Sequence, residues 1–149
     1  MSTITTPNPK MGRIIVTLTL TNWADRILAE RGFISAEEVR TLSVDDALVD
    51  TGATRLCLPA DLIEKLGLKQ TGTIDAQTAV GPHTVQVYEG LELIVEGRQG
   101  RYDCVEIPAG QTPLLGLIPL EDLGLNPDLQ AQKLIHLPTT GKETYMTIL

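Results

Sequence analysis

The chain has 149 residues, the length of one domain, and 42% of them are hydrophobic, so its composition excludes an intrinsically disordered protein. The net charge is −7 without a basic stripe, which argues against a nucleic-acid-binding protein, and no apolar run is long enough for a membrane span. Aromatic residues make up only 3%, so the core must consist mainly of Val, Ile, Leu and Ala.

The two ends of the chain differ in character from its middle. Residues 1–11 are expected to form a disordered leader, because Pro7 and Pro9 prevent regular structure. The leader has no signal-peptide pattern. Residues 12–137 are expected to form the single domain. Residues 138–149 are polar and then apolar, and are interpreted as a tail that is a candidate for contact with a second subunit.

The first strand is predicted at residues 13–21, where apolar and polar residues alternate. The residues expected on its buried face are Ile14, Val16, Leu18 and Leu20. Residues 22–38 are treated as an insertion. They are compatible either with a short helix at 24–31 that ends at Gly32 or with an extended excursion between two strands.

A second strand is predicted at residues 39–49, followed by a short helix over residues 59–67. Pro59 suits the first turn of a helix, and Gly67 suits a C-terminal stop. The apolar stripe of this helix is expected to contain Leu62, Ile63 and Leu66.

A meander of strands is predicted over residues 69–107, where period-two stretches are interrupted by glycines. Gly81-Pro82 is expected at the tip of a hairpin, and residues 97–100 mark the next turn. Further along, the apolar pair Leu114-Leu115 ends at Gly116. A second short helix over 119–124 and a last strand at 133–137 follow.

The two cysteines, Cys57 and Cys104, each lie in an apolar stretch and form no C-x-x-C pair. His83 and His136 have no metal-ligand spacing, so no metal site is expected. We interpret the cysteines as buried, reduced thiols of a cytoplasmic protein.

The most informative stretch is A-L-V-D-T-G-A at residues 47–53, where an apolar strand ends in an acid. Gly52 allows backbone angles that other residues avoid and a close approach to a ligand, and Thr51 supplies a hydroxyl that can tie down the turn. One aspartate is a weak catalyst for peptide hydrolysis. Two neighbouring carboxylates that share one proton can activate a water and protonate the scissile carbonyl oxygen.

The second acid of such a pair is absent from this chain, because the Asp-Thr-Gly motif at Asp50 has no second copy. Asp45 and Asp46 cannot supply it: Asp46 shares a strand face with Asp50 but lies about 13 Å away at strand rise. The second Asp50 must therefore come from a second subunit across a two-fold axis.

Three features resemble the retropepsin-like aspartic proteases, single-domain homodimeric relatives of the pepsin lobes. They are A-L-V-D-T-G-A at 47–53, a glycine hairpin tip at 80–82, and L-L-G followed by a short helix at 114–124. The resemblance covers residues 12–137. It implies a mostly β fold, in which a closed, barrel-like sheet carries two short helices and a flap hairpin.

The resemblance also implies a role for each part of the site, with Asp50 as the catalytic acid. The active-site loop would contain Thr51, Gly52, Ala53 and Thr54: Thr51 would interlock with its symmetry mate, and the next two residues would lend backbone groups to the substrate. The flap that binds the substrate would contain Ala79, Val80, Gly81, Pro82 and His83. A supporting second loop would contain Leu115 and Gly116. The family usually has an arginine after this glycine, whereas Leu117-Ile118-Pro119 follow here, so the protomer must be braced differently.

The expected function is that of a homodimeric aspartic endopeptidase, in which two Asp50 carboxylates activate a water to cleave an extended peptide or protein. No metal or organic cofactor, nucleic acid or membrane is expected to take part.

Two other functions are compatible with part of the sequence. The first is the D-x-G-x-T phosphate loop of sugar kinases, matched by residues 50–54, but that fold needs two large lobes and the chain is too short for them. The second is a catalytically inactive, dimeric peptide-binding module of the same fold. The intact Asp-Thr-Gly argues against it, because a binder gains nothing from a costly buried carboxylate pair.

Overall fold

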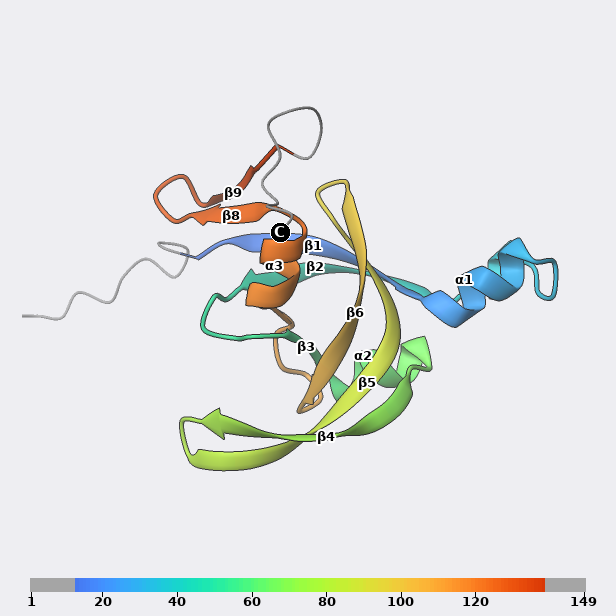
Figure 1. The fold of residues 1–149 in the computed structure, drawn as a ribbon, viewed down its shortest axis with the longest axis horizontal. Helices are drawn as coiled ribbons and strands as arrows, with labels where there is room; N and C mark the ends of the chain where they lie inside the picture. The colour runs from blue at the N-terminus through green and yellow to red at the C-terminus, as the bar shows by residue number, and fades with distance from the viewer. Residues whose placement is uncertain (1–12, 139–149) are drawn as a thin grey trace, which may run out of the picture.

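The computed structural model describes residues 13–138, except for the side chain of Thr78 (Figure 1). The predicted leader at residues 1–11 and all but the first residue of the predicted tail at 138–149 lie outside the described residues. The elements are β1 (Ile15–Asn22), α1 (Trp23–Glu30), a 3-10 turn (Ala36–Glu38), β2 (Thr41–Val49), β3 (Leu56–Pro59), α2 (Ala60–Leu66), β4 (Lys69–Thr78), β5 (Gly81–Val95), β6 (Arg98–Ile107), β7 (Leu114–Leu115), α3 (Leu117–Asp122), β8 (Leu125–Asp128) and β9 (Lys133–His136).

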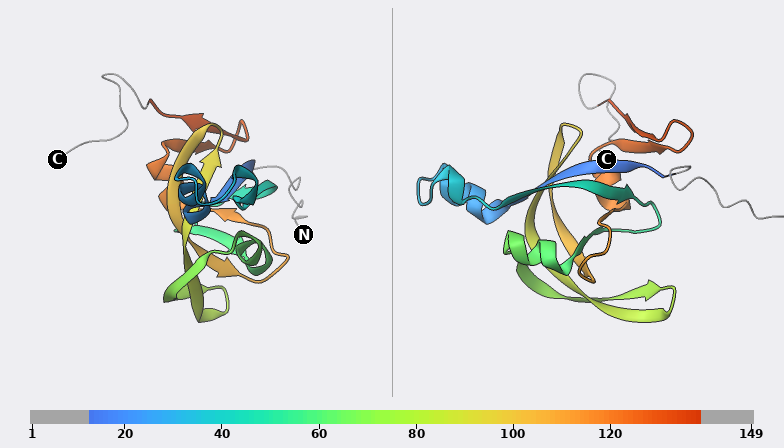
Figure 2. Two further views of the ribbon diagram at one scale, coloured as in Figure 1. Left: turned by 90° about the vertical axis from the view of Figure 1, so that its right-hand side faces the viewer. Right: turned by 180° about the vertical axis from the view of Figure 1, so that it is seen from behind.

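Six strands form a closed ring of hydrogen-bonded neighbours. The order β1-β2-β7-β3-β6-β5 is closed by antiparallel pairing of β5 with β1, in which Thr19 lies opposite Ile94. Closure removes the unpaired edges that an open sheet would present. β4 stays outside the ring and pairs only with β5, with which it forms a long hairpin at one side of the barrel (Figures 1 and 2). The predicted mostly β, barrel-like fold is thereby confirmed.

The barrel interior is filled by aliphatic side chains, as the low aromatic content requires. The predicted buried face of β1 is confirmed, since its four residues are each at most 5% exposed. They pack against the inward side chains of the other strands and of α2 and α3, among them Leu56, Leu58, Leu66, Leu91, Leu93, Leu115 and Leu120.

A β-bulge interrupts the pairing of β1 with β2. Val16 lies opposite Ala47 and Leu18 opposite Val44, so Asp45 and Asp46 together stand opposite one residue of β1. Both aspartates are exposed, while Val44 and Ala47 are buried three positions apart. The bulge keeps the apolar residues on both of its sides inside the barrel.

The helix predicted at residues 59–67 is confirmed as α2. Gly67 follows it with φ +63°, the left-handed conformation that favours glycine at a helix C-terminus. Of the two structures considered for residues 22–38, the helix is observed, as α1. Residues 13–138 therefore contain three α-helices instead of the predicted two. None of these helices is long and apolar enough to cross a membrane.

The end of the described chain differs from the prediction, because β8 was not predicted and pairs with β9 in a separate two-stranded sheet. Arg98 holds this hairpin against α3. Its guanidinium donates hydrogen bonds to the carbonyl oxygens of Leu123, Gly124 and Leu137 at 2.8, 2.9 and 2.6 Å. A cation at the C-terminal end of α3 also suits the helix dipole.

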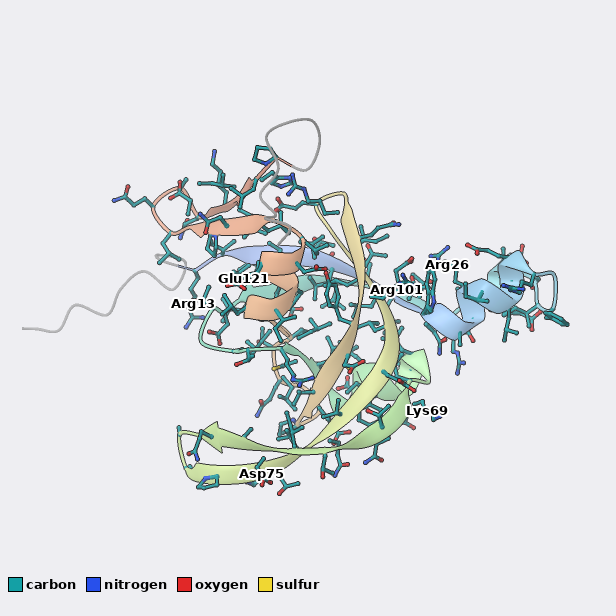
Figure 3. The ribbon with its side chains drawn as sticks, in the orientation of Figure 1. Arg13, Arg26, Lys69, Asp75, Arg101 and Glu121 are labelled. Atoms are coloured by element: carbon teal, nitrogen blue, oxygen red, sulfur yellow. The ribbon has the colours of Figure 1, made fainter. Side chains whose placement is uncertain are left out.

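The excursion that carries α1 projects from the barrel at the end opposite the β4–β5 hairpin tip (Figure 1). Its base is closed by Arg40, whose Nε and Nη2 donate to the two carboxylate oxygens of buried Asp25 at 2.7 and 3.0 Å. Arg26 pairs with the buried Glu92 of β5 at 3.0 Å, and Arg101 lies over the Trp23 ring. Figure 3 labels Arg26 and Arg101 at this base.

We predict that Asp25→Asn lowers the free energy of unfolding at pH 7 by about 1–3 kcal/mol, because the charge-assisted hydrogen bonds to Arg40 are lost. The Arg40 hydrogen bond holds the pKa of Asp25 below its ordinary value. The stabilisation is therefore complete above the unfolded pKa of about 3.9 and disappears as the pH falls through the lower folded pKa. Urea denaturation from pH 7 to pH 3 measures both effects.

The matched control is Asp46→Asn on the exposed bulge, which should change stability by less than about 0.5 kcal/mol. An Asp25→Asn variant as stable as the wild-type protein at pH 7 would contradict the assignment of the Asp25–Arg40 pair.

Candidate active site

Asp50 follows directly after β2, where β2 runs parallel to β7. Leu48 and Val49 lie opposite Leu114 and Leu115, and the Asp50 N–H donates to the Leu115 carbonyl oxygen at 3.0 Å. The acid is thus held at the mouth of the barrel by backbone bonds to the second loop, and its side chain is partly exposed.

The loop after Asp50 is a tight turn that holds the carboxylate. The Gly52 N–H donates to Asp50 Oδ1 at 2.9 Å, and the Ala53 N–H donates to the Asp50 carbonyl oxygen at 3.1 Å. The expectation of unusual backbone angles at Gly52 is wrong, because Gly52 is not among the residues with positive φ. A glycine is favoured at position 52 because there is little space for a side chain: an added Cβ would lie 3.1 Å from Asp50 Oδ1.

The side chains around the acid are open to solvent. Thr51 and Thr54 are exposed, and Ala53 is partly exposed. The Thr51 hydroxyl makes no hydrogen bond within residues 13–138, so the turn is fixed by the Gly52 N–H rather than by this hydroxyl.

The active-site loop is joined to the start of α3 by the helix backbone. The N–H groups of Leu117 and Ile118 donate to the carbonyl oxygens of Ala53 and Thr54 at 2.8 and 2.9 Å. The first N–H groups of a helix have no partner inside the helix, so the loop supplies what α3 lacks.

These bonds also explain why the predicted start of the second helix at Pro119 is wrong. The helix begins two residues earlier, at Leu117, and Pro119 occupies its first turn, where a missing N–H costs no hydrogen bond within the helix. The two residues that precede the proline were overlooked because their donors are satisfied by a segment more than 60 residues away.

Gly116 allows the two segments to approach this closely. A Cβ at Gly116 would lie 2.2 Å from the Arg55 carbonyl oxygen and 2.8 Å from that of Ala53, both of them backbone atoms that a side-chain rearrangement cannot move. Leu115 beside it is fully buried. The structure thus brings the predicted second loop into contact with the Asp50 loop.

The predicted flap corresponds to the tip of the β4–β5 hairpin. Thr78 pairs with Gly81, so the turn residues are Ala79 and Val80, and Gly81-Pro82 begin β5 rather than forming the tip as predicted. Gly81 has φ +108°, a conformation that residues with side chains rarely adopt, and Val80 is 91% exposed. The hairpin tip and the Asp50 loop lie at the same end of the molecule (Figure 1).

A hollow of about 710 Å³ lies beneath this hairpin. Of the five residues predicted to form the flap, Ala79, Val80 and His83 line this hollow, whereas Gly81 and Pro82 are not among its lining residues. The opposite wall was not predicted, because nothing local marks the end of β6 as facing the flap. The residues that line the hollow are Ala60, Ala79, Val80, His83, Thr84, Val85, Gln86, Glu106, Ile107, Pro108 and Gln111.

The two cysteines do not form a disulfide, and neither is prepared to act as a nucleophile. Burial raises the pKa of the Cys57 thiol, and the nearby charge of Asp50 raises it further. Burial and the charge of Asp103 raise the pKa of Cys104 to about 12. Both thiols therefore stay protonated at neutral pH.

Asp45, Asp46 and His136 lie on other elements than the Asp50 loop. His136 pairs with Glu96 at 2.7 Å on the surface, and Asp45 and Asp46 lie on the bulge. No group of three or more potential metal ligands of the His, Cys, Asp and Glu types occurs in residues 13–138.

Comparison with protein-family models gives a match over more than half of the chain. A family model described as "gag-polyprotein putative aspartyl protease" matches residues 40–122, which span β2, the Asp50 loop, the flap hairpin and α3. A search of curated proteins finds no match.

We predict that Gly116→Ala destabilises the protein by about 1–3 kcal/mol, because the added methyl group must push the 53–55 backbone away. The matched control is Gly72→Ala on β4, where an added Cβ would meet nothing within 4 Å and φ is not positive. Urea denaturation of both variants checks the difference. Equal stabilities would mean that the two loops do not approach as closely as described.

Proposed function

The chain belongs to this family of aspartyl proteases, and on that premise we propose that it is an endopeptidase whose active form is a homodimer. The observation that carries the proposal is the Asp50 loop. One carboxylate oxygen accepts a hydrogen bond from the Gly52 N–H, while the carboxylate stays partly open to solvent at the barrel mouth. This arrangement orients an acid without neutralising it.

The second acid is supplied by the Asp50 of a second copy. No other acid of the described chain lies in the active-site loop, and the nearest in sequence, Asp46, is on the bulge. A two-fold axis beside the loop brings two Asp50 carboxylates together, and like charges at that separation share one proton. The pair titrates as a unit with two macroscopic pKa values.

The distribution of exposed apolar side chains supports a partner at this end. Eight large hydrophobic residues are exposed in the described chain, and two of them, Leu28 and Phe33, lie on the α1 excursion. The other six belong to the start of β1, the flap tip, the start of α3 and the β8–β9 hairpin, which lie at the end opposite α1 (Figures 1 and 2). They are Ile15, Val80, Leu117, Ile118, Leu129 and Ile135.

Catalysis then needs only this chain's own groups and a water. The ionised carboxylate of the pair takes a proton from the water as it attacks the scissile carbonyl carbon, and the protonated carboxyl donates to the carbonyl oxygen. The flap closes over the extended peptide, excludes bulk water and positions the reacting carbonyl. Both backbone groups of Ala53 and the Gly52 N–H are already engaged within the protomer, so the loop offers the peptide the carbonyl oxygen of exposed Gly52.

The two other functions considered from the sequence are less well supported. A sugar kinase needs two lobes around its nucleotide, whereas residues 13–138 form one barrel with a small hairpin sheet. An inactive peptide-binding module has no use for the Gly52 hydrogen bond that orients the acid. A dimer that binds peptides and cleaves none would favour the binding module.

We predict that Asp50→Asn lowers kcat/KM for peptide cleavage by about 10²–10⁴-fold, because the amide can neither accept the proton of the water nor share one with its mate. The substitution preserves the shape of the side chain, so the dimer should persist. Cleavage of a peptide library at mildly acid pH and sedimentation of the same sample measure the two properties. Undiminished cleavage would remove Asp50 from the mechanism.

We predict that the double substitution Leu117→Glu and Ile118→Glu weakens dimerisation at least about 100-fold, because like charges then face each other across the axis. Both side chains are partly exposed, so the protomer should stay folded. Leu28→Glu on α1 is the matched control, since Leu28 is 40% exposed on a helix at the other end. Sedimentation against concentration, beside activity, measures the effect.

The expected result is a folded, inactive monomer for the double variant and an active dimer for the control. A double variant that dimerises like the wild-type protein would move the interface elsewhere. A wild-type protein that is active as a monomer at every concentration would contradict the shared dyad.

A further inference from the structure

The hollow beneath the flap combines apolar walls with a single carboxylate that faces it. Six of its lining residues are apolar, namely Ala60, Ala79, Val80, Val85, Ile107 and Pro108. The only acid among the lining residues is Glu106, and no lysine or arginine is among them. The hollow measures about 710 Å³, which is ample for one long side chain of a bound peptide.

Glu106 is fixed in place at the end of β6. It is half-buried, and its Oε1 accepts a hydrogen bond from the Tyr88 hydroxyl at 3.2 Å. Tyr88 pairs with Cys104 across β5 and β6, so Tyr88 and Glu106 lie on the same face of the sheet, two residues apart in register. Burial and the Glu106 hydrogen bond raise the pKa of Tyr88, which keeps the hydroxyl protonated as a donor.

The Glu106 carboxylate can accept further hydrogen bonds. A carboxylate can accept about four hydrogen bonds, and Tyr88 supplies the one that Glu106 accepts within residues 13–138. Asp75 of the same hairpin does not line the hollow and accepts a hydrogen bond from Thr84 Oγ1 at 3.1 Å. Figure 3 labels Asp75 on this hairpin. The one basic group of the lining is the imidazole of His83, which is exposed.

We propose that this hollow is a specificity subsite for a basic side chain, so that the substrates are peptides with arginine or lysine near the scissile bond. The methylene stem packs on the apolar walls, and the cationic head donates to Glu106. The inference rests on the proposed peptidase function and adds the class of substrate to it. Each protomer of the dimer contributes one such hollow.

Two other occupants fit less well. A leucine or phenylalanine side chain would fill the apolar part but would strip water from a half-buried carboxylate without replacing its hydrogen bonds. An acidic side chain would meet the like charge of Glu106. A basic side chain can pack its methylene stem on the apolar walls and donate hydrogen bonds to the Glu106 carboxylate.

The test profiles the wild-type enzyme with peptides in which each position around the scissile bond is arginine, leucine or glutamate in turn. We expect at least one position where arginine raises kcat/KM about tenfold or more over leucine. Glu106→Gln should reduce that arginine-to-leucine ratio about tenfold, because a charge-assisted hydrogen bond becomes a neutral one. Glu106→Lys should favour glutamate at the same position.

The matched control is Glu121→Gln, which removes an exposed carboxylate of α3 outside the hollow and should leave the ratio unchanged. A wild-type profile without preference for arginine at any position would overturn the inference. So would a Glu106→Gln variant whose ratio equals that of the wild-type enzyme.

A binding experiment separates this inference from the proposed function. The Asp50→Asn variant, with and without Glu106→Gln, is titrated with labelled arginine and leucine peptides, and fluorescence anisotropy reports the dissociation constants. Tighter binding of the arginine peptide that depends on Glu106 supports the subsite even if the wild-type protein cleaves nothing. Equal binding of both peptides while cleavage persists overturns the subsite and leaves the peptidase function intact.

Discussion

Backbone hydrogen bonds between the Asp50 loop and the start of α3 support the whole of the proposed active site. The carbonyl oxygens of Ala53 and Thr54 accept from the first two N–H groups of α3, and Asp50 itself donates to Leu115. Each segment thereby provides hydrogen-bond partners for backbone groups that have none within the other segment. A helix start needs acceptors, and a tight turn at a barrel mouth needs donors. Because both sets are main-chain atoms, the two segments must lie close together, which requires a residue without a side chain at Gly116.

This backbone connection also accounts for the missing arginine. Where relatives are expected to brace the protomer with a charged side chain after the glycine, this chain has Leu117 and Ile118. Their backbones supply the bracing, which leaves two apolar side chains for the outer surface. In the proposed dimer these side chains become contacts between protomers.

Most local features could be predicted from the sequence, because their causes are local. Alternation along β1 identified its buried face, and Pro59 and Gly67 delimited α2. The features that were missed have distant causes. The true start of α3 depends on acceptors in the 53–54 segment, and β8 is a strand only because β9 pairs with it. Likewise, Asp50 could be proposed from its motif alone, whereas Glu106 enters the hollow through the pairing of β6 with β5.

The bulge at Asp45 and Asp46 divides strand β2 into two halves, and the alternation of inward and outward side chains starts anew after it. Before it, Val44 faces the core in register with Leu18; after it, Ala47 faces the core in register with Val16. In an uninterrupted strand one of these two residues would point outward. The half that ends in Asp50 is thus aligned by its own pairing with β7 and not by the part of the strand that leads back to the α1 excursion. Evolution can therefore lengthen or rebuild that excursion without rotating the end of the strand that carries Asp50.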